Sequence, residues 1–311
     1  MAVNNSLQKS QKRLGIGSYL TGDAVKQRIN QVIGGKDGQR FISAVVSAVQ
    51  TNPGLQECTN QSILSAALLG ESLKLSPSPQ LGQYYMVPFN DRERGKVAQF
   101  QLGYKGYIQL AIRSGQYKKL NVLAIKDGEL IKFDPLNEEI EVRLIEDEEA
   151  REAAETIGYY AMFEYTNGFR KAIYWSKKKM LAHADKYSQA FSANGGTVKT
   201  RYGEKTKVSY SDYVAGNFDP KDAWMYSSFW YKDFDGMAYK TMLRQLISKW
   251  GIMSIDMASA IDADMAVIND DGTKDYVDND PDVIDMEPVS EPVQEAPAED
   301  IQSALFGGDG Q

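Results

Sequence analysis

The 311-residue chain contains very few of the side chains on which most catalytic and metal sites depend. It has one cysteine, Cys58, and one histidine, His183. A single cysteine cannot form an intramolecular disulfide, and two such residues are too few for a histidine and cysteine zinc site. The low cysteine content is typical of a protein from a reducing cytosol. We therefore expect no metal and no cofactor, and we interpret both residues as structural.

Long apolar segments are absent as well. No run of about 18 apolar residues occurs, so no membrane span is expected. The first residues, MAVNNSLQKS, lack the apolar stretch of a signal peptide. We expect a cytoplasmic protein.

Motifs for nucleotide hydrolysis and covalent catalysis are missing too. Gly34-Gly35-Lys36 is followed by Asp37, which does not fit the phosphate-binding loop G-x-x-x-x-G-K-[ST]. No G-x-G-x-x-G, G-x-S-x-G or H-E-x-x-H pattern occurs. The acidic residues between 138 and 149 lack the D-x-D or E-x-K spacing of a nuclease. The sequence therefore does not predict an enzyme.

The net charge of the whole chain is negative, but the charge is unevenly distributed along it. The net charge of −7 and the pI of about 5.0 argue against a nucleic-acid-binding protein. However, residues 256–311 hold 16 acidic residues and one basic residue, a net charge of −15. Residues 1–255 therefore have a net charge of +8, although residues 137–155 alone contribute −7. The acidic pI describes mainly the C-terminal segment, so charge has to be assessed segment by segment.

The apolar pattern predicts an α+β fold, because runs of strands are separated from runs of helices. We expect N-terminal helices, then antiparallel hairpins and a meander with packed helices. Asp127-Gly128 and Asn167-Gly168, each between two alternating apolar runs, are typical of two-residue hairpins. Further helices are expected over residues 21–33, 39–50, 105–114, 177–191 and 235–250, with one more capped by Thr59, and a hairpin over residues 82–102.

Composition divides the chain into three parts. Residues 1–20 are polar and are expected to form a flexible arm, and residues 21–255 to form the folded core. Residues 256–311 are rich in Asp, Glu and Pro, which predicts a disordered acidic tail. Its end, IQSALF, is a short apolar cluster that either occurs by chance or forms a peptide that docks a partner or masks the protein's own binding surface.

Three segments combine basic residues with aromatic ones, the combination that neutralises phosphates and stacks bases. In the first, Lys105 and Arg113 fall on one stripe of a helix that follows Tyr104, and Gly103 and Gly106 would let a phosphate approach the backbone. Lys118 and Lys119 extend this segment. The residues that we select in the other two segments are Lys199, Arg201, Tyr202, Lys205, Lys240 and Arg244.

Three blocks of sequence resemble the RecT family of phage recombinases, the single-strand annealing proteins of the RecT/Red-beta group. They are TNPGLQECTNQSILSAALLGESLKLSPSPQLGQYYMVPF, QFQLGYKGYIQLAIRSGQ and FWYKDFDGMAYKTMLRQLISKW, within residues 20–255. The resemblance implies ATP-independent annealing of complementary DNA strands by rings or filaments, beside a phage exonuclease. It also implies a basic groove between helical and sheet parts. The matching positions are Tyr104, Lys105, Arg113, Lys240 and Arg244.

The sequence thus favours a protein that binds single-stranded DNA, holds the annealed duplex intermediate and forms homo-oligomers. An exonuclease and a host single-strand-binding protein are candidate partners. Two alternatives stay open: an assembly or scaffold protein without annealing activity, and a metal-dependent nuclease.

Overall fold

The computed structural model describes residues 14–275, except residues 92, 189, 201–202 and 270. Its helices are α1 (Ile16–Thr21), α2 (Asp23–Ile33), α3 (Gly35–Thr51), α4 (Pro53–Gln56), α5 (Asn60–Ser72), α6 (Tyr104–Ser114), α7 (Glu148–Ala153), α8 (Lys177–Tyr187), α9 (Tyr210–Val214), η1 (Pro220–Tyr226), α10 (Phe229–Lys232), α11 (Phe234–Trp250) and α12 (Ile255–Ala263). Its strands are β1 (Tyr84–Asp91), β2 (Gly95–Leu102), β3 (Tyr117–Lys126), β4 (Leu130–Asp134), β5 (Glu139–Val142), β6 (Thr156–Tyr165), β7 (Arg170–Ser176), β8 (Gly196–Thr200), β9 (Gly203–Lys207), β10 (Val267–Ile268) and β11 (Lys274–Asp275).

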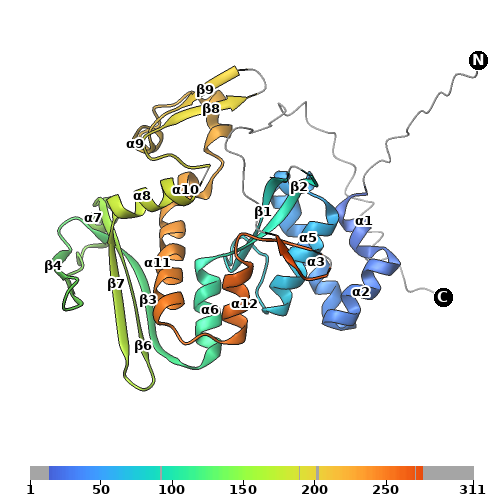
Figure 1. Cartoon of the computed structure of the whole chain (residues 1–311), viewed down its shortest axis with the longest axis horizontal. Helices are drawn as coiled ribbons and strands as arrows, with labels where there is room; N and C mark the ends of the chain where they lie inside the picture. The colour runs from blue at the N-terminus through green and yellow to red at the C-terminus, as the bar shows by residue number, and fades with distance from the viewer. Residues whose placement is uncertain (1–13, 92, 189, 201–202, 270, 276–311) are drawn as a thin grey trace, which may run out of the picture.

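Two hydrophobic cores divide the described residues into two lobes (Figure 1). The helical lobe consists of residues 14–116 and 251–275, and the sheet lobe of residues 117–233. Strand pairs are antiparallel in both lobes. The predicted α+β fold is confirmed, and most predicted helices are present with ends shifted by a few residues.

Helix α5 forms the centre of the helical lobe. The hydroxyl oxygen of Thr59 caps it by accepting a hydrogen bond from the Ser62 backbone N–H at 3.3 Å, as its sequence position predicts. Gly70 lets the helix approach strand β1, because a Cβ atom at this position would lie 2.3 Å from the Tyr84 ring. Strands β1 and β2 pair from Tyr84 opposite Leu102 onward, which confirms the first predicted hairpin.

The sheet lobe is built on the strand order β3-β6-β7. Alternate residues of β6, including Tyr159, Ala161 and Phe163, enter its core, because successive side chains of a strand point to opposite faces. Met180 and Ala184 of α8 pack into the same core. The hairpin at Asn167-Gly168 joins β6 to β7 as predicted.

Helix α11 lies between the lobes and belongs to both cores (Figure 1). Leu243 and Ile247 pack into the helical lobe, and Met242 and Leu246 pack into the sheet lobe. These two pairs lie about 100° apart around the helix. Helix α11 is therefore buried on two sides.

The predicted hairpin at Asp127-Gly128 is wrong in its pairing. The turn exists, with Gly128 at a φ of +83°, but β3 pairs with β6 and β4 pairs with β5. Strand β6 offers β3 a longer partner with a buried face, whereas the side chains of β4 are exposed or half-exposed. The buried Glu129 carboxylate accepts the Arg151 Nε–H at 2.6 Å and the Lys126 backbone N–H at 2.8 Å, which ties the turn to the end of β3 and to α7.

The expected segment boundaries also differ from the structure. Leu20 of α1 is fully buried, so the N-terminal arm does not extend to residue 20. Helix α12 begins where the acidic tail was expected, and its Ala260 and Ala263 are fully buried. Small apolar residues at helical spacing allow this part of an acidic segment to fold. The remainder of the expected arm and tail, residues 1–13 and 276–311, lies outside the described residues.

Among the described helices, none has both the length and the apolar character needed to cross a bilayer.

Candidate nucleic-acid interface

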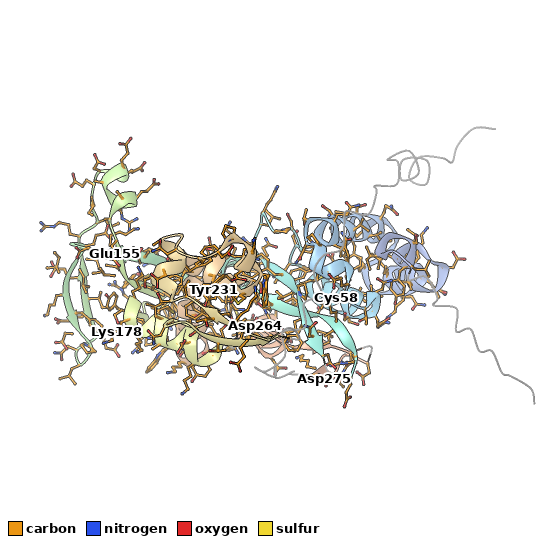
Figure 2. All side chains as sticks on the ribbon, turned by 90° about the horizontal axis from the view of Figure 1, so that it is seen from above. Cys58, Glu155, Lys178, Tyr231, Asp264 and Asp275 are labelled. Carbon is orange, nitrogen blue, oxygen red and sulfur yellow. The ribbon has the colours of Figure 1, made fainter. Side chains whose placement is uncertain are left out.

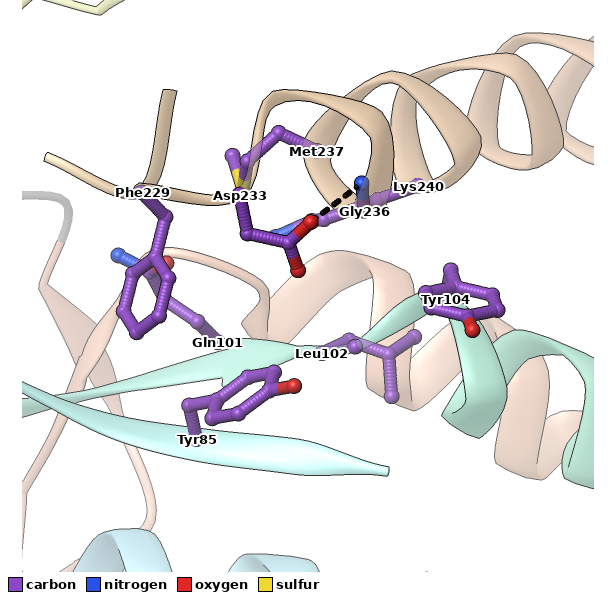
Figure 3. A pocket seen from close by; sticks show the side chains of 10 residues that line it. Tyr85, Gln101, Leu102, Tyr104, Phe229, Asp233, Gly236, Met237 and Lys240 are labelled. Atoms are coloured by element: carbon purple, nitrogen blue, oxygen red, sulfur yellow. Dashed lines mark hydrogen bonds between the residues drawn. The ribbon is translucent and has the colours of Figure 1, made fainter. Parts of the chain in front are cut away.

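Tyr104 begins α6 and lies next to the beginning of α11 (Figure 3), and Lys105 follows it in α6. The Tyr104 ring packs edge-on against Tyr239, with ring centroids 5.5 Å apart. Lys105 is exposed, and its Nζ lies 5.9 Å from the centroid of the Tyr104 ring. No described carboxylate forms an ion pair with Lys105. Its position suits a contact with an anionic backbone.

Gly103 and Gly106 are explained by chain packing rather than by approach of a phosphate. A Cβ atom at Gly103 would lie 2.1 Å from the Gly82 carbonyl oxygen, and one at Gly106 would lie 2.1 Å from the Gln83 carbonyl oxygen. The two glycines therefore let the start of α6 pack against the segment that precedes β1.

The stripe predicted on α6 is on the surface. Lys105, Gln109 and Arg113 are all exposed, while Tyr107 and Leu110 are buried. The Arg113 guanidinium donates a hydrogen bond from Nη2 to the Leu73 carbonyl oxygen at 2.6 Å, which holds it close to the end of α5. The stripe is a solvated helix face with two cations one turn or more apart.

Lys118 and Lys119 are exposed on β3 and share one acid from the neighbouring strand. Their Nζ atoms lie 2.6 and 3.5 Å from the carboxylate oxygens of Glu164. The hydrogen bond from Lys118, with the charge of both lysines, lowers the pKa of Glu164. Part of the positive charge that the sequence suggested here is therefore already compensated.

The basic segment around residue 200 forms the β8–β9 hairpin. Lys205 forms an ion pair with Asp222, and its Nζ lies 5.8 Å from the Trp224 ring centroid. Lys199 belongs to β8, but its side chain is outside the described atoms. Arg201 and Tyr202 lie outside the described residues.

Lys240 and Arg244 do not form the free cationic face that the sequence suggested. Lys240 donates a hydrogen bond to Oδ1 of Asp264 at 2.8 Å, and Arg244 donates one to Oδ2 at 2.6 Å. Asp264 Oδ1 also accepts the Leu102 backbone N–H at 2.9 Å. Lys240 is 8% exposed and Asp264 is 2% exposed, whereas the Arg244 side chain is 37% exposed.

This ion-paired cluster, Lys240, Arg244 and Asp264, connects α11 to the end of α12 and to β2. Figure 2 shows Asp264 near the middle of the molecule. The Asp264 carboxylate occupies the position between these two cations. The acid was assigned to the expected tail, so its pairing could not be foreseen.

A small cavity lies beside this cluster (Figure 3). Its volume of about 30 Å³ is enough to hold a water molecule. Tyr85 and Phe229 line one side, with ring centroids 5.5 Å apart, and Lys240 lines another. Burial, together with the charge of Asp233, raises the pKa of Tyr85. A nucleobase does not fit into this space, so we interpret it as part of the joint between the lobes.

One group of cations and rings, on α8 and the end of β7, is not among the residues that the sequence pattern singled out. Lys179 Nζ lies 4.3 Å from the Trp175 ring centroid, and the centroids of Trp175 and His183 are 5.3 Å apart. The centroids of His183 and Tyr187 are 4.6 Å apart, and Lys186 Nζ lies 5.2 Å from the Tyr187 centroid. We call these five residues the α8 strip. The spacing of 179, 183 and 186 along one helix face was the available signal.

Cys58 is fully buried in the helical core. In the described part of the chain, no three His, Cys, Asp or Glu side chains gather in a group that could hold a metal ion.

Comparison with known proteins matches most of the folded chain. A model of the RecT family matches residues 39–282. A Bacillus subtilis (strain 168) protein, "Uncharacterized protein YqaK", is 35% identical over 96% of this chain and 90% of its own length. "Protein RecT" of Escherichia coli (strain K12) is 28% identical over 73% of this chain and 71% of its own length. The matched range continues past residue 255, in agreement with the folded α12.

Proposed function

Since the chain belongs to the RecT family, we propose that it binds single-stranded DNA and anneals complementary strands without consuming ATP. Membership of the family supports a role in recombination by single-strand annealing in general. The match over residues 39–282, which spans both lobes and the cluster between them, is the observation that carries this proposal. The protein acts on DNA without making or breaking covalent bonds.

The physical basis of annealing is charge neutralisation. Lysine and arginine side chains that contact phosphates reduce the repulsion between two DNA strands and release the counterions bound to the DNA. Contacts to the backbone leave the base edges free, so Watson–Crick pairing supplies the specificity. Duplex formation is favourable, and for this reason no nucleotide hydrolysis is needed.

We propose that the interface includes Tyr104, Lys105 and Arg113 on α6 and Lys118 and Lys119 on β3. The exposed stripe on α6 supports the first group. Lys199, Arg201, Tyr202 and Lys205 of the β8–β9 region complete the surface that we propose. Arg244 reaches it only with its half-exposed guanidinium, and Lys240 acts by holding Asp264.

We further propose that the protein works as a ring or helical filament in the cytoplasm of a bacterial host, in phage homologous recombination. Protomers side by side would make the basic surface continuous. The acidic residues that follow Asp275 carry the apolar IQSALF sequence and are proposed to dock the phage exonuclease or a host single-strand-binding protein.

Annealing of two complementary labelled oligonucleotides at low salt, without nucleotide, tests the proposal directly. We expect duplex to form faster with the protein than without it. Lys105→Ala should weaken binding and reduce the salt dependence of log affinity by about 0.7, the value for one phosphate of a single strand. Lys132→Ala removes an exposed lysine of the β4–β5 hairpin, where it pairs with Glu139, and is the control. Failure of the full-length, oligomeric protein to accelerate annealing would refute the proposal.

A further inference from the structure

The α8 strip is a continuous row of rings and ammonium groups on the surface of the sheet lobe. Lys179, His183 and Lys186 follow one another on one face of α8, beside the buried face formed by Met180 and Ala184. Tyr187 ends the helix and is 61% exposed. The ring and cation distances between neighbours all lie between 4.3 and 5.3 Å.

The charges of this strip are not compensated. No described carboxylate forms an ion pair with Lys179 or Lys186, whereas Lys118, Lys205 and Lys240 each have one. The nearest acid in sequence, Asp185, accepts a hydrogen bond from the Ala193 backbone N–H at 2.8 Å and so holds the following loop.

The histidine in the strip is surrounded by positive charge. Partial burial lowers the pKa of His183, and the charges of Arg244, Lys179 and Lys186 lower it further. The ring is therefore neutral at pH 7. A neutral ring between two lysines leaves the positive charge at the ammonium groups, while the aromatic surface stays available for stacking.

We propose that the α8 strip is a binding site for single-stranded nucleic acid, in which Tyr187 stacks on a base and Lys179 and Lys186 contact the flanking phosphates. The His183 ring packs against Tyr187, and the Trp175 ring packs against His183. Alternating rings and cations are the combination by which proteins bind single strands without sequence preference. The inference rests on the proposed function and adds a base-stacking site that the three sequence segments do not contain.

Two probes separate stacking from charge: oligothymidylate and an abasic deoxyribose-phosphate strand of equal length. Tyr187→Ala should weaken binding of oligothymidylate about fivefold or more and leave binding of the abasic strand unchanged. Tyr187→Phe should restore the affinity, because the ring is kept. Lys179→Ala should weaken binding of both strands and lower the salt dependence of log affinity by about 0.7.

Lys178→Ala is the matched control, because Lys178 is exposed on the same helix but has no ring beside it. It should leave the preference for oligothymidylate over the abasic strand unchanged. Tyr187, Lys179 and Lys186 are all exposed, so the folded state should survive each substitution, and thermal unfolding checks this.

The outcomes distinguish the two proposals. If the unmodified protein binds neither strand at low salt, the proposed function fails and the inference fails with it. If it binds oligothymidylate and all α8 variants bind equally well, only the α8 site is wrong. Equal losses for both probes with Tyr187→Ala would overturn the stacking role.

Discussion

Lysines on two neighbouring helices have opposite surroundings in this protein. Lys240 on α11 is 8% exposed and is held by Asp264, whereas Lys179 on α8 is exposed and faces an aromatic ring. Both were plausible phosphate contacts from their residue type. The comparison shows that the availability of a cation depends on which acid the fold brings to it.

The buried lysine and the exposed lysine should therefore differ in their contributions to folding and to DNA binding. A buried ion pair that loses one partner leaves an uncompensated charge in a poorly solvated place, which destabilises the folded state. An exposed lysine contributes little to folding but can release a counterion on binding a phosphate.

The largest effect is expected when the chain is shortened so that it loses the folded part of its acidic C-terminal segment. A chain that ends at Ser259 loses the last turn of α12, β10 and Asp264, and we expect it to lose cooperative unfolding altogether. A chain that ends at Asp275 keeps all of these and should unfold at the same denaturant concentration as the full-length protein. Urea unfolding followed by circular dichroism measures both. Equal stability of the two shortened chains would show that α12 is not part of the core.

Asp264→Ala should have the next largest effect. It leaves Lys240 buried without its acid and removes an acceptor from the Leu102 N–H, so a loss of about 3–5 kcal/mol in the free energy of unfolding is expected. Asp262→Asn, which removes an exposed acid of α12 that pairs with Lys274 of β11, should cost less than about 1 kcal/mol. Comparable losses for the two variants would contradict the importance of the buried cluster.

Lys240→Ala and Lys179→Ala should separate stability from binding. We expect Lys240→Ala to lower the free energy of unfolding by about 1–3 kcal/mol, since Asp264 keeps Arg244 and the Leu102 N–H as partners. Lys179→Ala should leave unfolding unchanged and weaken only DNA binding. Urea titration and binding of a labelled oligonucleotide, measured on both variants, give the comparison. A binding defect at full stability in Lys240→Ala would place it in the interface.

The smallest effect concerns His183 and the positive charge around it. Because its pKa is lowered in the folded state, the unfolded chain binds the extra proton more readily below about pH 6.5. Stability contributed by the neutral ring is therefore present above this pH. It declines as the pH falls from the pKa of His183 in the unfolded chain towards its lower pKa in the folded state. In His183→Gln this part of the decline should disappear, as urea midpoints at pH 5.5, 6.5 and 7.5 would show. An unchanged pH profile would mean that His183 titrates alike in both states.

Much of the fold was predictable because it depends on local pattern. Thr59 caps α5, Gly115 ends α6 in the left-handed conformation, and β1 pairs with β2 across a short charged turn. Such features are set by residues a few positions apart. The pairing of β3 with β6 was missed because the turn at Gly128 is the same whether or not its flanking strands pair.

The candidate interface was predictable only in part. Lys105 and Arg113 are exposed, as the helical stripe indicated. The α8 strip was missed because its rings come from two elements, β7 and α8. The sequence of α8 is that of an ordinary charged surface helix. The compensation of Lys118 by Glu164 could not be foreseen either, since these residues lie far apart in sequence and meet across two strands.

The sequence by itself determined that this chain forms α and β elements, that it has few residues for metal or covalent chemistry, and that its acidic residues gather near the C-terminus. Residue type, spacing and composition are local properties, and they fix these features. Only the tertiary structure decided which charges are free. Folding brings Asp264 between Lys240 and Arg244 and leaves Lys179 and Lys186 on the surface, because burial of α12 against the helical core carries its acid into the joint between the lobes.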